Sequence, residues 1–187
     1  MTTHPERWQA IAVVGSSGSG KTSLARRLSS TLNLSHIELD ALYHLPDWRH
    51  RTAEEFRAEI QRAVTSTENG WVMCGGYDTV AGPLRDAHAD TIIWLDLPRR
   101  TVLRRIVLRT VRRGITREEL WNGNRESILG LLRPDPDKNV ALRAMLSFAS
   151  KRARYASNIR TGVWAGKQVV ILRSPSEVKR FVAGIRA

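Results

Sequence analysis

Residues 15–22 read Gly-Ser-Ser-Gly-Ser-Gly-Lys-Thr, and they fit the phosphate-binding pattern G-x-x-x-x-G-K-[ST] in full. Glycines let such a backbone curl so that successive N–H groups point at phosphate oxygens, and the helix that follows adds its positive N-terminus. In this chemistry the lysine reaches the β- and γ-phosphates and the threonine hydroxyl ligates Mg²⁺. We therefore expect a bound nucleotide and Mg²⁺ here, held by Gly15, Ser16, Ser17, Gly18, Ser19, Gly20, Lys21, Thr22 and Ser23.

The flanking sequence predicts the surrounding fold. Apolar runs alternate with segments of helical periodicity, and strands that are continuous apolar runs are typical of a parallel sheet covered on both faces. We therefore expect a three-layer α/β/α P-loop NTPase fold with a five-stranded parallel sheet. The predicted strands are Trp8 to Val14, Ser35 to Leu39, Trp71 to Cys74, Thr91 to Leu95 and Gln168 to Leu172.

The predicted helices begin at recognisable signals. One runs from Lys21 to Leu32, another opens at a Thr52–Glu55 capping box, and a third, rich in arginine, runs from Thr101 to Val111. A closing helix starts at Ser174, Pro175 and Glu177, a second capping box with proline in the first turn. Between about residues 112 and 166 the alternation lapses, with breaks at Pro134 and Pro136. We expect one domain, 1–187, in which 112–166 form a helical lid that folds over the site.

Length and composition exclude several other classes. A chain of 187 residues with 42% hydrophobic residues is long enough to bury a core and is not a disordered basic tail. No run approaches the roughly 18 apolar residues of a membrane span, and the polar N-terminus does not resemble a signal peptide. A single cysteine excludes an internal disulfide framework. We expect a cytoplasmic protein without membrane contact, and the net charge of +12 favours polyanionic partners, either nucleotides or nucleic acid.

The base of the nucleotide is less directly specified. A GTPase would show Asn-Lys-x-Asp after a strand, and the chain has no such motif. Arg173, Ser174 and Pro175 follow the last strand, where P-loop kinases place an adenine-contacting loop, although the same residues also suit a helix cap. We therefore expect ATP, with Arg173 and Pro175 beside its base.

P-loop enzymes also need a carboxylate that holds the metal's water shell or accepts the proton of the acceptor. The third strand ends Met73-Cys74-Gly75-Gly76-Tyr77, without an acid. Glu38 and Asp40 close the second strand, and residues two apart on a strand share a face. We expect Glu38 to bind the metal together with Thr22, and we expect Asp40 and Lys21 to be catalytic residues. Asp96, which closes the fourth strand, is a further candidate carboxylate, although Asp-x-Pro also suits a turn, and Asp40 also suits a cap at the start of a loop.

The acceptor and the transferred phosphate require further groups. Gly75 and Gly76 would let an acceptor approach the backbone, and Arg85 could grip an anionic one, although surface arginines are common. Arg109 and Arg113 share a helix face and suit the charge of a phosphoryl group. We interpret Arg99, Arg100, Arg104 and Arg105 as a solvated face, and Cys74 as packing. The predicted acceptor-binding residues are Asp40, Tyr43, Gly75, Gly76, Tyr77, Arg85 and Arg125.

Taken together, these residues resemble those of a known family, the adenylate-kinase-like P-loop proteins described as DNA topology modulation proteins (FlaR-like). The matching stretches are Gly15 to Thr22, Leu39 to Leu42 with Trp48, Trp71-Val72 leading to Gly75 and Tyr77, Ala89-Asp90, Ile93 to Pro98, Arg109, and Leu120 to Glu126. The resemblance implies a nucleoside-monophosphate-kinase-like fold with a mobile lid, ATP binding and phosphoryl transfer. It also implies that Asp40 faces the acceptor and that Arg109 and Arg125 belong to the lid side.

One departure from this family concerns the third strand. The family commonly shows Glu-Gly-Asn-Tyr there, where this chain has Cys74-Gly75-Gly76-Tyr77. An acid associated with the metal and a polar contact to the acceptor are therefore missing at this strand. Their absence favours Glu38 and Asp40 as the carboxylates of the site.

Three functions fit this sequence. The favoured one is a kinase that moves the γ-phosphate of Mg·ATP to a small-molecule acceptor, such as a nucleotide or a nucleoside, as a monomer or homodimer. The second is an ATP-dependent nucleic-acid binder, which the charge and the six Trp residues favour but the lack of a nucleic-acid-binding signature does not. The third is an ATP-binding protein with only residual ATPase activity.

Overall fold

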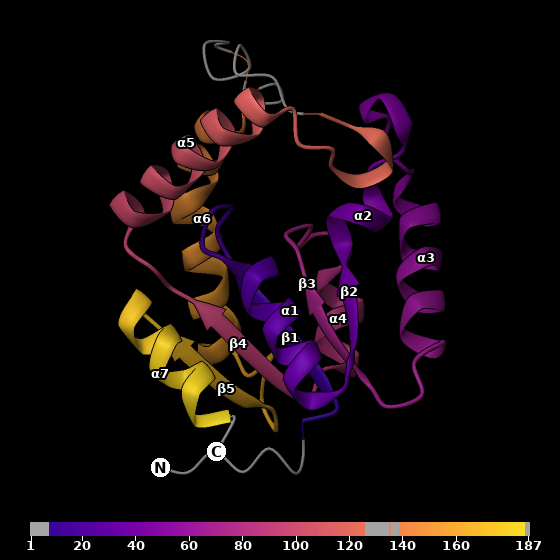
Figure 1. The fold of residues 1–187 in the computed structure, drawn as a ribbon. Coiled ribbons are helices and arrows are strands. Elements are labelled where there is room, and N and C mark those ends of the chain that lie inside the picture. The colour runs from indigo at the N-terminus through magenta and orange to yellow at the C-terminus, as the bar shows by residue number, and fades with distance from the viewer. Residues whose placement is uncertain (1–7, 126–134, 136–138, 186–187) are drawn as a thin grey trace.

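The computed structural model describes residues 8–125, 135 and 139–185. Its centre is a sheet of five parallel strands in the order β2-β3-β1-β4-β5, which confirms the predicted sheet (Figure 1). The second strand ends one residue earlier than predicted, because Leu39 already belongs to a helix. The strands are β1 (Ala10–Gly15), β2 (Ser35–Glu38), β3 (Trp71–Cys74), β4 (Thr91–Leu95) and β5 (Gln168–Leu172).

Helices cover both faces of this sheet, which gives the predicted three layers. One face packs against α1 and α7, and the other against α3, α4 and α6. The helices are α1 (Lys21–Leu32), α2 (Leu39–Tyr43), α3 (Ala53–Thr65), α4 (Gly82–His88), α5 (Arg99–Thr116), α6 (Val140–Arg160) and α7 (Pro175–Ile185), with 3₁₀ turns η2 (Pro46–Trp48) and η3 (Trp121–Gly123).

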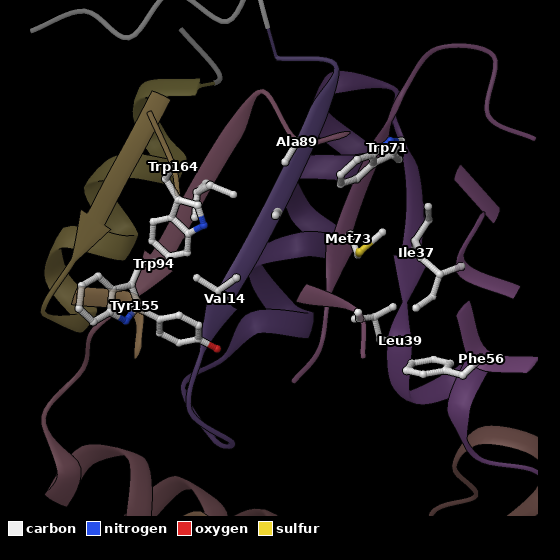
Figure 2. Packing of buried hydrophobic residues seen from close by; sticks show 14 residues of the cluster. Val14, Ile37, Leu39, Phe56, Trp71, Met73, Ala89, Trp94, Tyr155 and Trp164 are labelled. Atoms are coloured by element: carbon white, nitrogen blue, oxygen red, sulfur yellow. The ribbon is translucent and has the colours of Figure 1, made fainter. Parts of the chain in front are cut away.

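Side-chain alternation along the strands divides the core into two halves. Val13 and Cys74 face α1, whereas Val14 and Met73 face the layer of α3, α4 and α6. Figure 2 shows the second half, where the rings of Trp94 and Tyr155 meet edge to face with centroids 5.7 Å apart. Aromatic rings in this geometry add about 0.5–1.5 kcal/mol per pair to the burial of their area. The first half holds Leu24 and Leu28 of α1 and Val182 of α7.

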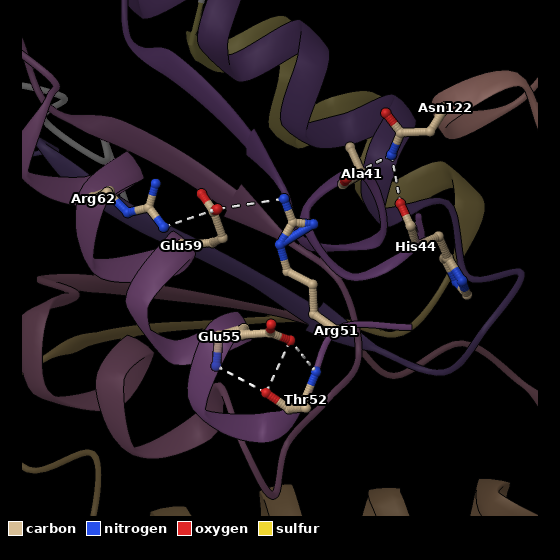
Figure 3. A network of polar contacts seen from close by, with 8 residues as sticks. All are labelled: Ala41, His44, Arg51, Thr52, Glu55, Glu59, Arg62 and Asn122. Atoms are coloured by element: carbon tan, nitrogen blue, oxygen red, sulfur yellow. Dashed lines mark hydrogen bonds and ion pairs between the residues drawn. The ribbon is translucent and has the colours of Figure 1, made fainter. Parts of the chain in front are cut away.

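The capping box predicted at Thr52 is present in full, whereas the one predicted at Ser174 is present in part, because the Glu177 side chain accepts from the N–H of Arg173 and not from that of Ser174. The Thr52 side chain accepts from the Glu55 N–H at 3.2 Å, and the Glu55 carboxylate accepts from the Thr52 N–H at 2.8 Å (Figure 3). The Ser174 hydroxyl accepts from the Glu177 N–H at 3.1 Å, while the Glu177 carboxylate accepts from the N–H of Arg173. These contacts fix where the chain turns from loop into α3 and α7.

The segment predicted as a lid, 112–166, contains the end of α5, η3 and α6. Helix α5 runs to Thr116 rather than Val111, because no proline interrupts it and one internal glycine costs only about 1 kcal/mol. Leu97, Val102 and Ile106 are buried against Ala144 of α6. Residues 126–134 and 136–138, including Glu126, Pro134 and Pro136, lie outside the described residues. Within the described part of the chain, no helix is long and apolar enough to cross a membrane.

Candidate active site

The candidate site lies at the carboxyl edge of the sheet, at the end of β1 and between its neighbours β3 and β4. Parallel register brings Glu38, Cys74 and Val13 to one level of the sheet. Two residues further along the strands, it brings Gly15, Leu95 and Leu172 to one level. Strand order reverses at β1, since β3 lies on one side and β4 on the other. Ligands of open parallel sheets bind at such a switch point.

The loop between β1 and α1 adopts a conformation that depends on glycine. Gly18 has φ +77°, and a Cβ built on it would lie 2.9 Å from the Val102 carbonyl oxygen of α5. Gly15 has φ +144°, with the Leu95 carbonyl oxygen 2.8 Å from the corresponding position. The loop is therefore pressed against β4 and α5, where only a hydrogen fits. Ser19 is 2% exposed, and its N–H donates to the Ser16 carbonyl at 3.2 Å.

Lys21 begins α1, and its ammonium folds back over the loop to donate to the Ser16 carbonyl at 2.8 Å. Loss of water around this ammonium, together with the nearby cations Lys151 and Arg109, lowers the pKa of Lys21 to about 8, although Asp40 partly offsets these effects. A cation so poorly compensated favours a polyanion at this position. Lys21, Asp40 and Arg109, all predicted site residues, thus lie within electrostatic reach of one another.

The two predicted metal ligands also meet. The Thr22 hydroxyl donates to the Glu38 carboxylate at 3.3 Å, and the other Glu38 oxygen pairs with Arg26 at 3.1 Å. A hydroxyl and a carboxylate are hard oxygen donors, and Mg²⁺ in phosphate sites is commonly held by one or two protein oxygens together with phosphates and water. These residues therefore fit Mg²⁺. Among residues 8–125, 135 and 139–185, no group of three or more His, Cys, Asp or Glu side chains could hold a metal ion by itself.

Cys74 occupies the end of β3, where the sequence lacks an acid. Its sulfur lies 3.8 Å from the Thr22 hydroxyl oxygen and 3.3 Å from His36 Nε2. Burial raises the pKa of this thiol to about 12. The thiol is therefore neutral beside Thr22, and Glu38 from the neighbouring strand is the carboxylate that reaches this threonine.

Asp40 lies in the first turn of α2, not on β2, so the expected strand face shared with Glu38 is wrong. The strand ends before Asp40, and Leu39 turns its side chain into the core. The two carboxylates separate: Glu38 pairs with Thr22, and Asp40 accepts from the Tyr77 hydroxyl at 2.8 Å. Burial first, and then the Asp40 charge, raise the pKa of Tyr77. The phenol therefore remains a hydrogen donor to Asp40.

Tyr43, on the same short helix as Asp40, belongs to an aromatic cluster. Its ring stacks on His50 with centroids 4.8 Å apart and lies 4.5 Å from the ring of Tyr77. Tyr77, at φ +56°, follows the Gly75-Gly76 pair. Among the predicted acceptor residues, Tyr77 therefore contacts both Asp40 and Tyr43, and Gly76 precedes it at a position where a Cβ would be 3.2 Å from Lys151 Nζ.

Arg85, predicted to grip an anionic acceptor, has a different environment. Its side chain is 3% exposed and pairs with Asp78 and Asp86, at 2.9 Å in each case. The Tyr155 hydroxyl donates to the same Asp78 carboxylate at 2.9 Å. Burial tends to raise the pKa of Asp78, but Arg85 and Tyr155 outweigh it and hold this pKa below its ordinary value. The guanidinium is thus committed to the protein, and we leave Arg85 out of the acceptor site.

The arginines of α5 divide by position. Arg109 contributes to the potential at Lys21, whereas the Arg113 guanidinium lies 6.0 Å from the centroid of the Trp121 ring and 3.8 Å from Glu118. Arg105, expected on a solvated face, instead donates to the Ser19 carbonyl at 3.0 Å, because the phosphate loop rests on α5. Arg99, Arg100 and Arg104 are exposed, as predicted.

The remaining predicted residues lie on the periphery. Arg173 is exposed and lies 4.0 Å from Asp96, while Pro175 opens α7. Asp96 is held by Arg152 of α6 through two hydrogen bonds of 2.8 and 3.1 Å. The Arg125 side chain is exposed and lies 3.7 Å from Glu119. Among the described residues, no hydrogen bond or ion pair joins Arg125 to Asp40 or Lys21.

Sequence reasoning missed three residues around the site: Asp78, Lys151 and Tyr155. Lys151 and Tyr155 are four apart on α6, so they share a helix face, and both interact with Asp78. That spacing was visible in the sequence. What was not visible is that this face of α6 meets the loop after β3, more than 70 residues earlier in the chain.

Comparisons with known proteins give limited similarity. No protein-family model matches the chain. A curated protein of Gloeobacter violaceus, a bifunctional pantoate ligase/cytidylate kinase, is 44% identical over 46 residues, which cover 25% of this chain and 9% of that protein. The similarity thus spans less than a tenth of that protein's length.

Proposed function

We propose that this protein is an ATP-dependent phosphotransferase that moves the γ-phosphoryl group of Mg·ATP to a small-molecule acceptor, a nucleotide or a nucleoside. The observation that carries the proposal is the meeting of Lys21, Thr22 and Glu38 at one end of the sheet, with Asp40 and Arg109 within electrostatic reach of Lys21. The five-stranded parallel sheet and the partial similarity to a protein with cytidylate kinase in its name fit a nucleotide kinase.

Each residue has a role that its surroundings allow. The phosphate loop would hold the β- and γ-phosphates through its N–H groups and Lys21, and Thr22 and Glu38 would hold Mg²⁺, which supplies positive charge to neutralise the phosphates. Arg109 would stabilise charge on the transferred group. Arg173 and Pro175 would lie beside the adenine, after β5.

Asp40 would face the acceptor from the other side. With a hydroxyl acceptor, the new oxygen–phosphorus bond forms as the bond to the bridging oxygen breaks, ADP leaves, and Asp40 takes the hydroxyl proton. With a phosphate acceptor no proton need move, and Asp40 would orient the acceptor instead. Tyr77, which donates to Asp40, keeps the carboxylate in place for either role.

The proposal is tested by measuring ADP formation from Mg·ATP against a panel of nucleoside monophosphates, nucleosides and hydroxyl metabolites. One class of acceptor should stimulate turnover, and Lys21→Ala should lower that rate about 100-fold or more, the loss that follows removal of one donor to developing negative charge in other enzymes. A flat panel with slow, acceptor-independent hydrolysis would refute transfer to these acceptors and favour an ATP-binding protein with residual ATPase activity.

The outer face of α5 favours a second candidate, an ATP-dependent nucleic-acid-binding protein. Helix α5 carries seven arginines and no acidic residue, and Arg100, Arg104 and Arg112 are exposed on it. If these arginines contacted DNA phosphates, DNA binding would weaken steeply as the salt concentration rises. Binding of a DNA duplex that is retained at 50 mM salt, falls at 200 mM and is lost in an Arg100→Glu/Arg104→Glu variant would support it; binding unaffected by these changes would exclude this face.

A further inference from the structure

Two loops of the same construction face each other beside the acceptor side of the site. In Leu45–Arg49, the N–H of Leu45 donates to the Arg49 carbonyl at 2.7 Å; in Leu120–Asn124, the N–H of Leu120 donates to the Asn124 carbonyl at 2.7 Å. Each loop has two consecutive residues in the left-handed region at its tip: Asp47 and Trp48 in the first, Asn122 and Gly123 in the second. Trp48 in the first loop and the whole of the second belong to the stretches that resemble the DNA topology modulation proteins, and none of these residues takes part in the proposed phosphoryl transfer.

Asn124 is the central contact between the loops. Its side-chain oxygen accepts from the Trp48 N–H at 2.7 Å, and its amide nitrogen donates to the carbonyls of Leu45 at 2.9 Å and Trp121 at 2.8 Å. The residue is 4% exposed. Both N–H groups and the oxygen of this buried amide are therefore used, and the reversed orientation would set like groups against each other.

Asn122, in the same loop, holds the end of α2. A helix of five residues leaves its last carbonyls without partners inside the helix. The Asn122 amide donates to the carbonyl of His44, which follows α2, and at 3.4 Å to that of Ala41 (Figure 3). The helix fixed in this way is the one that carries Asp40.

Ring contacts continue the same connection. Trp121 stacks on His44 with centroids 5.6 Å apart and planes 17° apart. His44 Nε2 lies 3.2 Å from the Tyr77 hydroxyl, which donates to Asp40 at 2.8 Å. A continuous chain of contacts therefore runs from the Leu120–Asn124 loop through His44 and Tyr77 to the Asp40 carboxylate.

We infer that the Leu120–Asn124 loop is a clamp on α2, and that Asn122 and Asn124 are positioning residues that orient Asp40 toward the acceptor. The positioning role rests on the proposed function, whereas the clamp does not. The residue types follow from this role: asparagine tolerates a left-handed backbone at 122, and its amide donates to carbonyls as no carboxylate can.

The clamp is tested with Asn124→Asp and Asn122→Asp, which keep shape but replace N–H donors by oxygen. Asn33→Asp is the matched control, because it adds the same charge at an exposed left-handed position after α1, remote from the loops. Hydrogen exchange is measured on full-length protein for residues 39–48 and, as internal reference, for β1 and β4. We expect Asn124→Asp to speed exchange in residues 39–48 about tenfold or more with the reference unchanged, Asn122→Asp to do so about threefold, and Asn33→Asp to change nothing.

Kinetics then test the positioning role. Asn124→Asp should lower kcat/KM for the acceptor about tenfold while the KM for ATP stays within about twofold, since the phosphate loop is not touched. Exchange equal to wild type in both loop variants would overturn the clamp, whatever the activity. Faster exchange with unchanged acceptor kinetics would overturn the positioning of Asp40. If wild-type protein transfers phosphate to no acceptor while exchange still rises in the variants, the proposed function and the positioning role fail and the clamp on α2 stands.

Discussion

The buried ion pair between Asp78 and Arg85 allows a quantitative prediction. The two side chains are 5% and 3% exposed, and Asp78 also accepts from the Tyr155 hydroxyl. Asp78→Asn keeps the volume but removes the charge that compensates Arg85. Removing one partner of a buried pair costs about 3–5 kcal/mol, and because Arg85 retains Asp86 at 2.9 Å we expect the lower end, about 3 kcal/mol of unfolding free energy.

Chemical denaturation monitored by circular dichroism measures this loss. For a chain of this size, about 3 kcal/mol corresponds to a fall in melting temperature of roughly 6–12 °C. Glu118→Gln is the control, because it breaks the Arg112–Glu118 pair, whose side chains are 67% and 37% exposed, and should cost less than about 1 kcal/mol. A loss below about 1 kcal/mol for Asp78→Asn would show that Asp86 alone compensates Arg85 and would refute the reasoning.

The same pair predicts a dependence on pH. The folded protein holds the pKa of Asp78 below its ordinary value, so the unfolded chain takes up this proton first as pH falls. The stability from Asp78 is therefore fully present above the ordinary aspartate pKa of about 3.9 and is lost as pH falls through the lower, folded value. The difference in stability between wild type and Asp78→Asn should be constant from about pH 5 to 8 and shrink below about pH 4. A difference that persists unchanged at lower pH would contradict this account.

Three further predictions concern the phosphate loop and its surroundings. Phosphate binding should raise the pKa of Lys21 from about 8, so calorimetry at pH 8 in two buffers of different ionisation enthalpy should show proton uptake on binding Mg·ATP, and Lys21→Arg should show none. Gly18→Ala should lower unfolding free energy by about 1–3 kcal/mol, since its Cβ would meet the Val102 carbonyl, whereas Gly184→Ala, with open space around it, should be neutral or slightly stabilising by thermal melting. Cys74, 1% exposed and with its thiol pKa raised to about 12, should resist a thiol-specific reagent at pH 8 until denaturant is added; rapid labelling of native protein would contradict its burial.

Short elements limit what could be predicted around the acceptor. The long apolar runs gave all five strands, but the boundary between β2 and α2 falls between Glu38 and Leu39, where no periodicity marks it. The prediction therefore placed Glu38 and Asp40 on one face of a strand, which is wrong. It also placed Glu38 beside Thr22, which the hydrogen bond between them confirms. Arg85 illustrates a second limit: whether a guanidinium faces a ligand or a buried acid depends on Asp78 and on Tyr155, which lies 70 residues further along the chain.

The phosphate-loop motif, the strand segments and the N-caps of α3 and α7 could be predicted from the sequence, because each depends on neighbouring residues: glycines that adopt positive φ, a helix N-terminus next to a strand, a side chain three residues from the N–H it caps. The surroundings of Asp40 and Lys21, in contrast, depend on contacts between distant parts of the chain. Asn124 meets Trp48 across 76 residues, and Lys151 approaches Gly76 across 75. Such contacts are set by how whole helices pack on the sheet, and packing is a property of buried surfaces that no local pattern contains.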